Sequence, residues 1–222
     1  MDRHFFDELN SLKQELLNMG SLVEEMVSIA VRALVEHDVN LLETIRQNEA
    51  RVNRLQVDID EYCLKLIALH QPAASDLRFL LGISKINAEL ERVGDHTVNI
   101  CKGISVVLEK EQVKPFIDMP KMVEIVSSMF KESLHAFVIL DVDKARMILL
   151  RDDQVDQLRY KIIQELIELM KKEPEKVETA VSLILTANSF EKIADHATNI
   201  AEVVIFVAQG KDVRHHFEDP LL

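Results

Sequence analysis

The stretch Glu91–Ile100 reads ERVGDHTVNI, and it returns 100 positions later as Glu191–Ile200, which reads EKIADHATNI. Glu, Asp, His, Asn and Ile occupy the same places in both copies. A five-residue identity at fixed spacing in so short a chain indicates an internal duplication. The two copies are therefore expected to adopt the same local structure.

The composition favours an almost wholly helical protein. The 222 residues include only 5 Gly, 5 Pro and no Trp, while hydrophobic residues make up 48%. Few helix breakers, with abundant Leu, Ile, Val, Glu and Lys, are typical of long helices around a substantial core. The formal net charge of −12 opposes binding to nucleic acid and to anionic lipid surfaces, and it favours cations and basic partners.

The chain shows no sign of secretion or of membrane insertion. Its two cysteines, Cys63 and Cys101, imply buried free thiols in a reducing compartment rather than a disulfide framework. The N-terminus lacks the charged and apolar regions of a signal peptide. No apolar run approaches the roughly 18 residues that a membrane span needs. We expect a soluble intracellular protein without membrane insertion.

Apolar residues at helical spacing predict six long helices in an all-α fold. The expected ranges are 4–37, 38–70, 75–109, 120–141, 143–172 and 174–210. Asp38 and Ser75 are predicted N-caps, Pro120 and Pro174 suit first turns, and Gly210 is a natural C-cap.

The helices group into two tandem, pseudo-symmetric three-helix bundles of antiparallel helices. Residues 1–112 are the first predicted repeat, 113–119 a linker, 120–210 the second repeat and 211–222 a C-terminal tail. Gly94 and Ala194 share one repeat position, where small side chains would let neighbouring helices approach. The methionines at helical spacing are expected to fill the core. These are Met19, Met26, Met122, Met129 and Met147.

Oxygen-bearing side chains recur every fourth residue within the duplicated motif. Glu91, Asp95 and Asn99 therefore share one helix face, away from the apolar stripe and open to water. The second copy repeats this with Glu191, Asp195 and Asn199. One interpretation is a solvated acidic face. The other is chelation of a hard cation, because carboxylate and amide oxygens are its preferred ligands.

Antiparallel packing brings further oxygen ligands level with the motif. If the second and third helices pair about residue 72, Asn53 lies level with Glu91 and Glu49 level with Asp95. In the second repeat the corresponding pairs are Asp156 with Glu191 and Asp152 with Asp195. Each repeat thus places ligands from two helices at one height, which suits one or more bridging cations.

At these residues the sequence resembles the PhoU family of phosphate-uptake regulators. The resemblance is carried by Pro72–Arg78 (PAASDLR), Glu89–Ile100 and the copy Glu191–Glu202. It implies two side-by-side three-helix bundles with surface clusters of iron, zinc or other metal ions. It also implies a cytoplasmic protein, usually a homodimer. Such a protein restrains phosphate import and represses phosphate-starvation signalling through the ABC phosphate transporter and its sensor histidine kinase.

The resemblance also assigns metal ligands to each repeat. The first site would use Glu49, Glu91, Asp95 and Asn99. The second would use Asp152, Asp156, Glu191, Asp195, Asn199 and Glu202. The first repeat has Asn53 in place of Asp156 and Lys102 in place of Glu202. Because hard cations bind more tightly as ligand charge rises, the second site is predicted to be the stronger.

Two other functions remain as alternatives. A di-iron carboxylate oxidase needs paired Glu-x-x-His motifs that point into a bundle, whereas Glu132–His135 occurs here without a second copy. A metal-free structural adaptor would bind no metal at all. His96 and His196 follow the motif aspartates, so they point about 100° away from them. They suit either supporting contacts or a solvated surface. We expect a non-enzymatic regulator.

Overall fold

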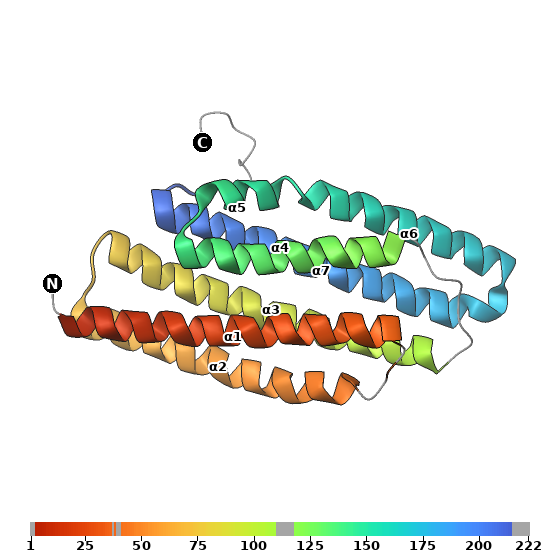
Figure 1. Ribbon diagram of the computed structural model, residues 1–222, viewed down its shortest axis with the longest axis horizontal. Coiled ribbons are helices and arrows are strands. Elements are labelled where there is room, and N and C mark those ends of the chain that lie inside the picture. The colour runs from red at the N-terminus through yellow and green to blue at the C-terminus, as the bar shows by residue number, and fades with distance from the viewer. Residues whose placement is uncertain (1–2, 37, 39–40, 110–117, 215–222) are drawn as a thin grey trace.

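The computed structural model describes residues 3–36, 38, 41–109 and 118–214, and these fold almost wholly into helices (Figure 1). No strand occurs within these ranges, so the all-α prediction is confirmed. The elements are α1 (Arg3–Glu36), α2 (Leu41–His70), α3 (Ser75–Leu108), α4 (Asp118–Ile139), α5 (Val142–Leu149), α6 (Asp152–Lys172), a short 3₁₀ turn η1 (Pro174–Lys176) and α7 (Val177–Gln209).

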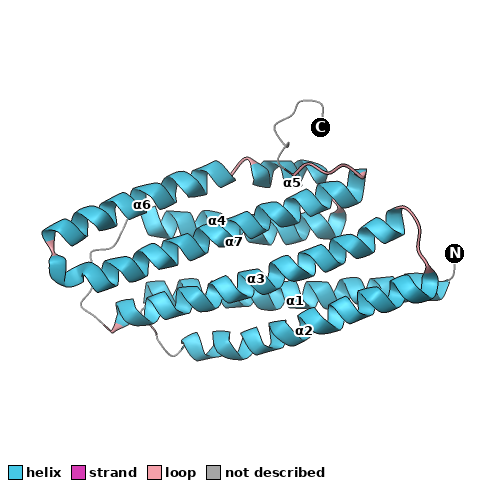
Figure 2. Ribbon diagram, turned by 180° about the vertical axis from the view of Figure 1, so that it is seen from behind, coloured by secondary structure: helices cyan, strands magenta, loops and turns pink. Residues whose placement is uncertain are grey.

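The helices form two layers. Figure 2 shows α2, α3, α7 and α6 side by side across one broad layer, with α1 and α4 behind them. Helices α1, α2 and α3 pack together as one bundle, and α4, α6 and α7 as the other, with α5 lying against α4 and α7. Each bundle buries an apolar core. Leu12 and Ile59 are among the largest fully buried side chains of the first bundle, and Phe130, Phe137 and Phe190 are among those of the second.

The two bundles meet most extensively where α3 packs antiparallel against α7. Glycine makes this approach possible at two points of α3. A Cβ at Gly82 would lie 2.4 Å from Val207 Cγ2, and one at Gly103 would lie 2.2 Å from Thr186 Oγ1 and 3.1 Å from the Ser182 carbonyl oxygen. The α3–α7 contact is therefore closer than side chains larger than glycine would allow at these two positions.

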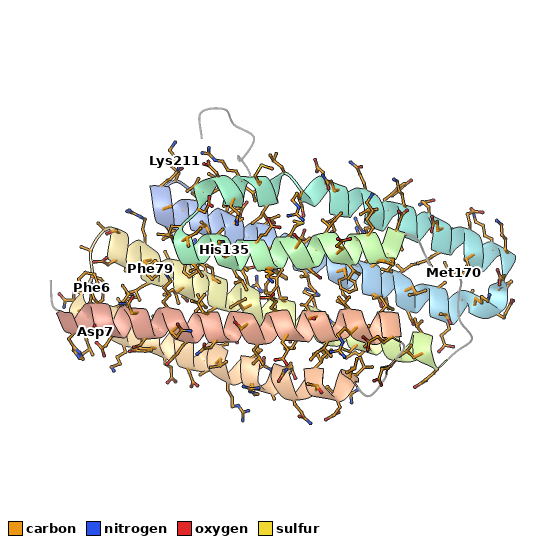
Figure 3. The ribbon with its side chains drawn as sticks, in the orientation of Figure 1. Phe6, Asp7, Phe79, His135, Met170 and Lys211 are labelled. Carbon is orange, nitrogen blue, oxygen red and sulfur yellow. The ribbon has the colours of Figure 1, made fainter. Side chains whose placement is uncertain are left out.

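A second junction joins the bundles near the end of α4. Phe79 of α3 stacks on Phe137 of α4 with ring centroids 5.6 Å apart, close to the labelled His135 (Figure 3). Lys13 Nζ of α1 donates a hydrogen bond of 2.9 Å to the Val138 carbonyl and lies 6.0 Å from the Phe79 ring centroid. These contacts join α1 and α3 of the first repeat to α4 of the second.

Most predicted helix boundaries agree with the structure. Asp141 caps α5 by accepting a 2.9 Å hydrogen bond from the Lys144 amide. Gly210 ends α7 at a φ of 71°, and its amide bonds the Phe206 carbonyl. The prediction for Ser75 is wrong by one residue: Ala74 holds the cap position at a φ of 48°, and Ser75 makes no capping hydrogen bond.

The predicted fifth helix is two helices. It breaks at residues 150–151, which separate α5 from α6. At the break the Arg151 amide bonds the Ile148 carbonyl, and the Arg151 guanidinium donates a 2.9 Å hydrogen bond to Glu132 of α4. The sixth predicted helix opens with the 3₁₀ turn at Pro174, and α7 itself begins at Val177.

Gly94 faces the first core, where a Cβ would meet Val52 and Met26 at ordinary contact distances of 3.5 and 3.8 Å, so the position takes a side chain as small as alanine. One core prediction is wrong. Met147 is 59% exposed on α5, whereas the other four methionines are buried. Residues 110–117, which hold most of the predicted linker, lie outside the described residues, as do residues 39–40 at the start of α2.

Candidate metal-binding acidic clusters

The register of α2 against α3 is the one that the sequence predicts. Ser84 Oγ donates a 2.9 Å hydrogen bond to Asp60 Oδ1, and Asn87 Nδ2 donates a 2.8 Å bond to the Gln56 carbonyl. If the two helices pair about residue 72, as the sequence predicts, the residues joined by each contact lie at the same height to within one residue. Glu49 and Asn53 of α2 are thereby carried to the height of Asp95 and Glu91 on α3.

The first acidic cluster consists of Glu49, Glu91 and Asp95. Burial raises the pKa of Glu91, and the charges of Asp95 and Glu49 raise it further. Asn53 Nδ2 donates a 2.9 Å hydrogen bond to Glu49 Oε1, so its amide supports the cluster. Carboxylates from α2 and α3 thus face one another across the helix boundary.

Asn99, the remaining predicted ligand of the first site, lies on the exposed surface one turn beyond Asp95. Its side-chain oxygen accepts a 3.1 Å hydrogen bond from Lys102 Nζ. Lys102, whose positive charge opposes cation binding at the first site, is therefore hydrogen-bonded to Asn99, one of the predicted ligands.

The second acidic cluster consists of Asp152, Asp156, Glu191 and Asp195. Burial, followed by the charges of Asp195, Asp156 and Glu191, raises the pKa of Asp152 to about 6. Four carboxylates from α6 and α7 therefore stand within electrostatic reach of one another. Their mutual repulsion is the physical condition under which a bound cation stabilises a site.

Two basic side chains lie within the second cluster, and the sequence analysis missed both. Lys192 Nζ lies 2.6 Å from Asp195 Oδ2 and 3.3 Å from Glu191 Oε2. Arg159 Nε lies 3.6 Å from Asp156 Oδ1 and 3.8 Å from Glu191 Oε1. The spacing of Lys192 from Asp195 and of Asp156 from Arg159, three residues on one helix, is the signal that could have revealed these pairs.

Two further predicted ligands of the second site point elsewhere. Asn199 Nδ2 donates a 2.9 Å hydrogen bond to Glu89 Oε2 across the α3–α7 contact. Glu202 interacts with the guanidinium of Arg214 and raises its pKa. The structure therefore gathers the four carboxylates of α6 and α7 and leaves Asn199 and Glu202 to other partners.

The negative charge of the two clusters suits a cation, but their side chains are not arranged around a common metal position. Carboxylate oxygens on neighbouring helices are the donors that hard cations prefer. Among the residues that the structure describes, however, no group of three or more His, Cys, Asp or Glu side chains is arranged to hold a metal ion. Lys192, which is half exposed, would have to leave Asp195 before a cation could take its place.

Comparison with known proteins agrees with the duplicated architecture. The model of the PhoU domain matches the chain twice, over residues 16–104 and 119–204. The chain belongs to the PhoU family. The first match begins within α1 and ends within α3, and the second begins within α4 and ends within α7, so each match falls on one bundle of the fold.

Relatives in the PhoU family match nearly the whole chain. A homologue from Pseudomonas putida is 36% identical over 97% of this chain and 84% of its own length, and that of Escherichia coli strain K12 is 32% identical over 98% and 90%. Both are named phosphate-specific transport system accessory proteins. The crystal structure of PhoU from Pseudomonas aeruginosa covers 93% of this chain and 100% of that chain, at 34% identity and a TM-score of 0.90. That of the regulatory protein from Streptococcus pneumoniae covers 94% and 99%, at 33% identity and a TM-score of 0.87.

The PhoU relatives are named as accessory or regulatory proteins of phosphate transport and not as enzymes, which confirms the prediction of a non-enzymatic regulator. The residues of the oxidase alternative are otherwise engaged. Glu132 accepts hydrogen bonds from Ser128 and Arg151, and His135 is exposed beside Lys144. None of the helices described is long and apolar enough to cross a membrane.

Proposed function

We propose that this chain restrains phosphate import and represses the phosphate-starvation response from the cytoplasm. It does so by contact with the ATPase subunit of the ABC phosphate transporter and with the associated sensor histidine kinase. The observation that carries this proposal is the double match to the PhoU domain over both bundles. The names of the relatives support it, and the formal net charge of −12 is consistent with basic partner surfaces.

The acidic clusters are proposed to bind metal ions, with iron or zinc as the first candidates. Glu49, Glu91 and Asp95 would hold a metal in the first cluster, with Asn99 available once Lys102 moves away. The second cluster would use its four carboxylates, with Asn199 and Glu202 as outer ligands after rearrangement. Bound metal would neutralise repulsion between helices and alter the charge offered to a partner. The protein is also proposed to act as a homodimer.

A deletion strain tests the proposed role. Removal of the gene is expected to derepress phosphate-scavenging genes in phosphate-rich medium, because the contact that represses the kinase is lost. A reporter for those genes and uptake of labelled phosphate are the measurements. Return of the parent gene should restore repression. Unchanged expression together with unchanged import in the deletion strain would contradict the proposal.

Co-purification tests the proposed partners. The tagged chain from phosphate-replete cells is expected to retain the transporter ATPase subunit and the sensor kinase. Glu91→Gln with Asp195→Asn alters both clusters and should weaken this retention if their charge contributes to docking. Asp7→Asn on the distant, exposed start of α1 is the matched control for loss of a surface carboxylate.

Metal content tests the proposed difference between the clusters. Asp195→Ala is expected to remove more bound metal than Asp95→Ala, because the second cluster has four carboxylates and the first has three. Both variants and the parent are titrated with Fe or Zn under identical conditions. Equal losses, or a larger loss from Asp95→Ala, would show that carboxylate number does not set the order.

A further inference from the structure

The α3–α7 contact brings two histidines from the two repeats together. His96 and His196 occupy the same position of the duplicated motif, and their ring centroids lie 5.3 Å apart with an interplanar angle of 31°. His196 is buried and 8% exposed, whereas His96 is partly open to solvent. The burial of His196 was not expected from the sequence, because it depends on contact between the bundles.

A carboxylate fixes the ring of His196. Its Nδ1 lies 2.7 Å from Glu89 Oε2, which also accepts a 2.9 Å hydrogen bond from Asn199. Burial alone would raise the pKa of Glu89, but the bonds from His196 and Asn199 outweigh burial and lower it. Glu89 is therefore an ionised acceptor, so the proton at this contact belongs to Nδ1 of His196.

The other ring nitrogen of His196, Nε2, is buried and has no hydrogen-bond partner. Glu89 and His96 are seven residues apart on α3, which is about 10 Å along the helix. Because Nδ1 is engaged by Glu89, Nε2 is the ring nitrogen of His196 that remains for a ligand beside His96. A buried nitrogen lone pair without a partner is costly unless it has a ligand.

The separation of the two ring centroids, 5.3 Å, fits a pair of imidazole ligands on one metal ion. With metal–nitrogen bonds of about 2.0–2.1 Å and a tetrahedral angle, two imidazole ring centres on one Zn²⁺ lie roughly 5 Å apart. Metal-binding histidines commonly donate their other ring N–H to a carboxylate, as His196 does to Glu89. Ser189 stands at the repeat position of Glu89, so His196 has a carboxylate anchor that the repeat does not provide for His96.

We propose that His96 and His196 together bind one borderline metal cation, of the class of Zn²⁺, Cu²⁺ or Ni²⁺, at the junction of the two repeats. Glu89 and Asn199 act as positioning residues for His196, and water completes the coordination. This site goes beyond the proposed function and does not depend on the acidic clusters. It uses nitrogen rather than oxygen ligands, which selects a different class of metal. A bound ion would cross-link α3 to α7.

Charges of both signs lie close to this junction. Asp95 and Asp195 act electrostatically on the His96 ring, and so does the opposing positive charge of Lys192. These two carboxylates bring negative charge close to the imidazole pair. Two protein nitrogens are fewer ligands than a closed structural zinc site provides, so the affinity is expected to be modest.

Copper spectroscopy tests the proposal on untagged, full-length protein. His215 and His216 are first changed to Gln, so that the adjacent tail imidazoles do not compete for the ion. With one equivalent of Cu²⁺, the electron paramagnetic resonance spectrum should show hyperfine coupling to two nitrogens. His96→Gln and His196→Gln should each remove one nitrogen and weaken binding by about tenfold or more. His135→Gln, at an exposed histidine on α4, should change neither quantity.

A second histidine pair provides an internal comparison. His4 and His70 have ring centroids 6.3 Å apart, but His70 Nε2 is already bonded to Glu8 at 2.8 Å. Loss of the nitrogen coupling on His4→Gln, with no effect from His96→Gln or His196→Gln, would overturn the proposal. A spectrum with oxygen ligands only, or failure of the parent to bind Cu²⁺, would overturn it too.

Thermal melting separates a ligand effect from misfolding. Zn²⁺ should raise the melting temperature of the parent but not that of the His96→Gln variant. Because the side chain of His96 is only partly buried, the metal-free melting temperature of this variant should match that of the parent. Glu89→Gln keeps both imidazoles and removes the anchoring charge, so it should weaken Zn²⁺ binding by about 10–100-fold. Equal stabilisation of parent and His96→Gln by Zn²⁺ would overturn the proposal.

Discussion

Asp152 is the carboxylate on which the second acidic cluster acts most strongly. It stands at the start of α6, where burial and the charges of four neighbouring carboxylates oppose its ionisation. Its pKa is raised from an ordinary 3.8 to about 6. The folded protein therefore binds a proton at Asp152 more tightly than the unfolded chain does. Ionisation of this group lowers stability as pH rises from about 4 through 6.

Asp152→Asn is expected to stabilise the metal-free protein above pH 6. One pKa unit corresponds to about 1.36 kcal/mol, and partial exposure screens the group, so the gain should be about 1–2 kcal/mol at pH 7.5. It should vanish below about pH 3, where the carboxyl is protonated in both states because the pH lies under the ordinary pKa of 3.8 as well as the folded value of about 6. Urea denaturation with chelator present at several pH values measures it. Glu165→Gln, at an exposed charge further along α6 and outside the cluster, is the control. A gain independent of pH, or equal in the control, would contradict repulsion as the cause.

At the scale of elements, the α3–α7 pair depends on which glycine faces which neighbour. Gly103 faces the backbone of α7, where the Ser182 carbonyl cannot move aside, whereas Gly94 faces flexible side chains of the first core. Both lie inside one helix, so a Cβ gives each the same gain in helix propensity. The two positions therefore separate propensity from packing.

Gly103→Ala is expected to destabilise the protein by about 1–3 kcal/mol, because its Cβ would overlap Thr186 and press on the α7 backbone. Gly94→Ala should be neutral or stabilising by up to about 1 kcal/mol. Chemical denaturation of both variants and the parent provides the comparison. Equal effects of the two substitutions would show that α3 and α7 do not pack as closely as the structure has them.

The elements also show what sequence can predict. Six helical segments and the α2–α3 register follow from local rules, namely apolar spacing, caps and the position of the turn at residue 72. The break between α5 and α6 has no Gly or Pro to announce it, since residues 149–152 read LLRD. At the break Arg151 makes a tertiary hydrogen bond to Glu132 of α4, and no local sequence pattern contains that contact.

The candidate site also has one part that the sequence predicts and one part that it does not. The levels of the carboxylates were predictable because they depend only on the register within each bundle. The burial of His196 and its bond to Glu89 depend on how the two bundles face each other. Apolar periodicity identifies a buried stripe on α3 and on α7 but not the pairing of one with the other. Sequence therefore predicted each cluster and missed the junction between them.

At the scale of the whole molecule, the contacts of α3 with α7 and of Phe79 with Phe137 make the two repeats one structure. Neither bundle can unfold without exposing the apolar surface of the other. The protein is therefore expected to unfold in one cooperative transition, although its sequence is a tandem repeat.

Phe130→Ala tests this cooperativity. Phe130 lies in α4 of the second bundle and is 1% exposed, so truncation should cost about 3–5 kcal/mol. If the repeats unfold together, amide exchange in the slowest-exchanging part of α2, in the other bundle, should accelerate by the amount that corresponds to the same free energy. Calorimetry should show a single transition at a lower temperature. Two transitions, or unchanged exchange in α2 beside accelerated exchange in α4, would mean that each repeat unfolds by itself.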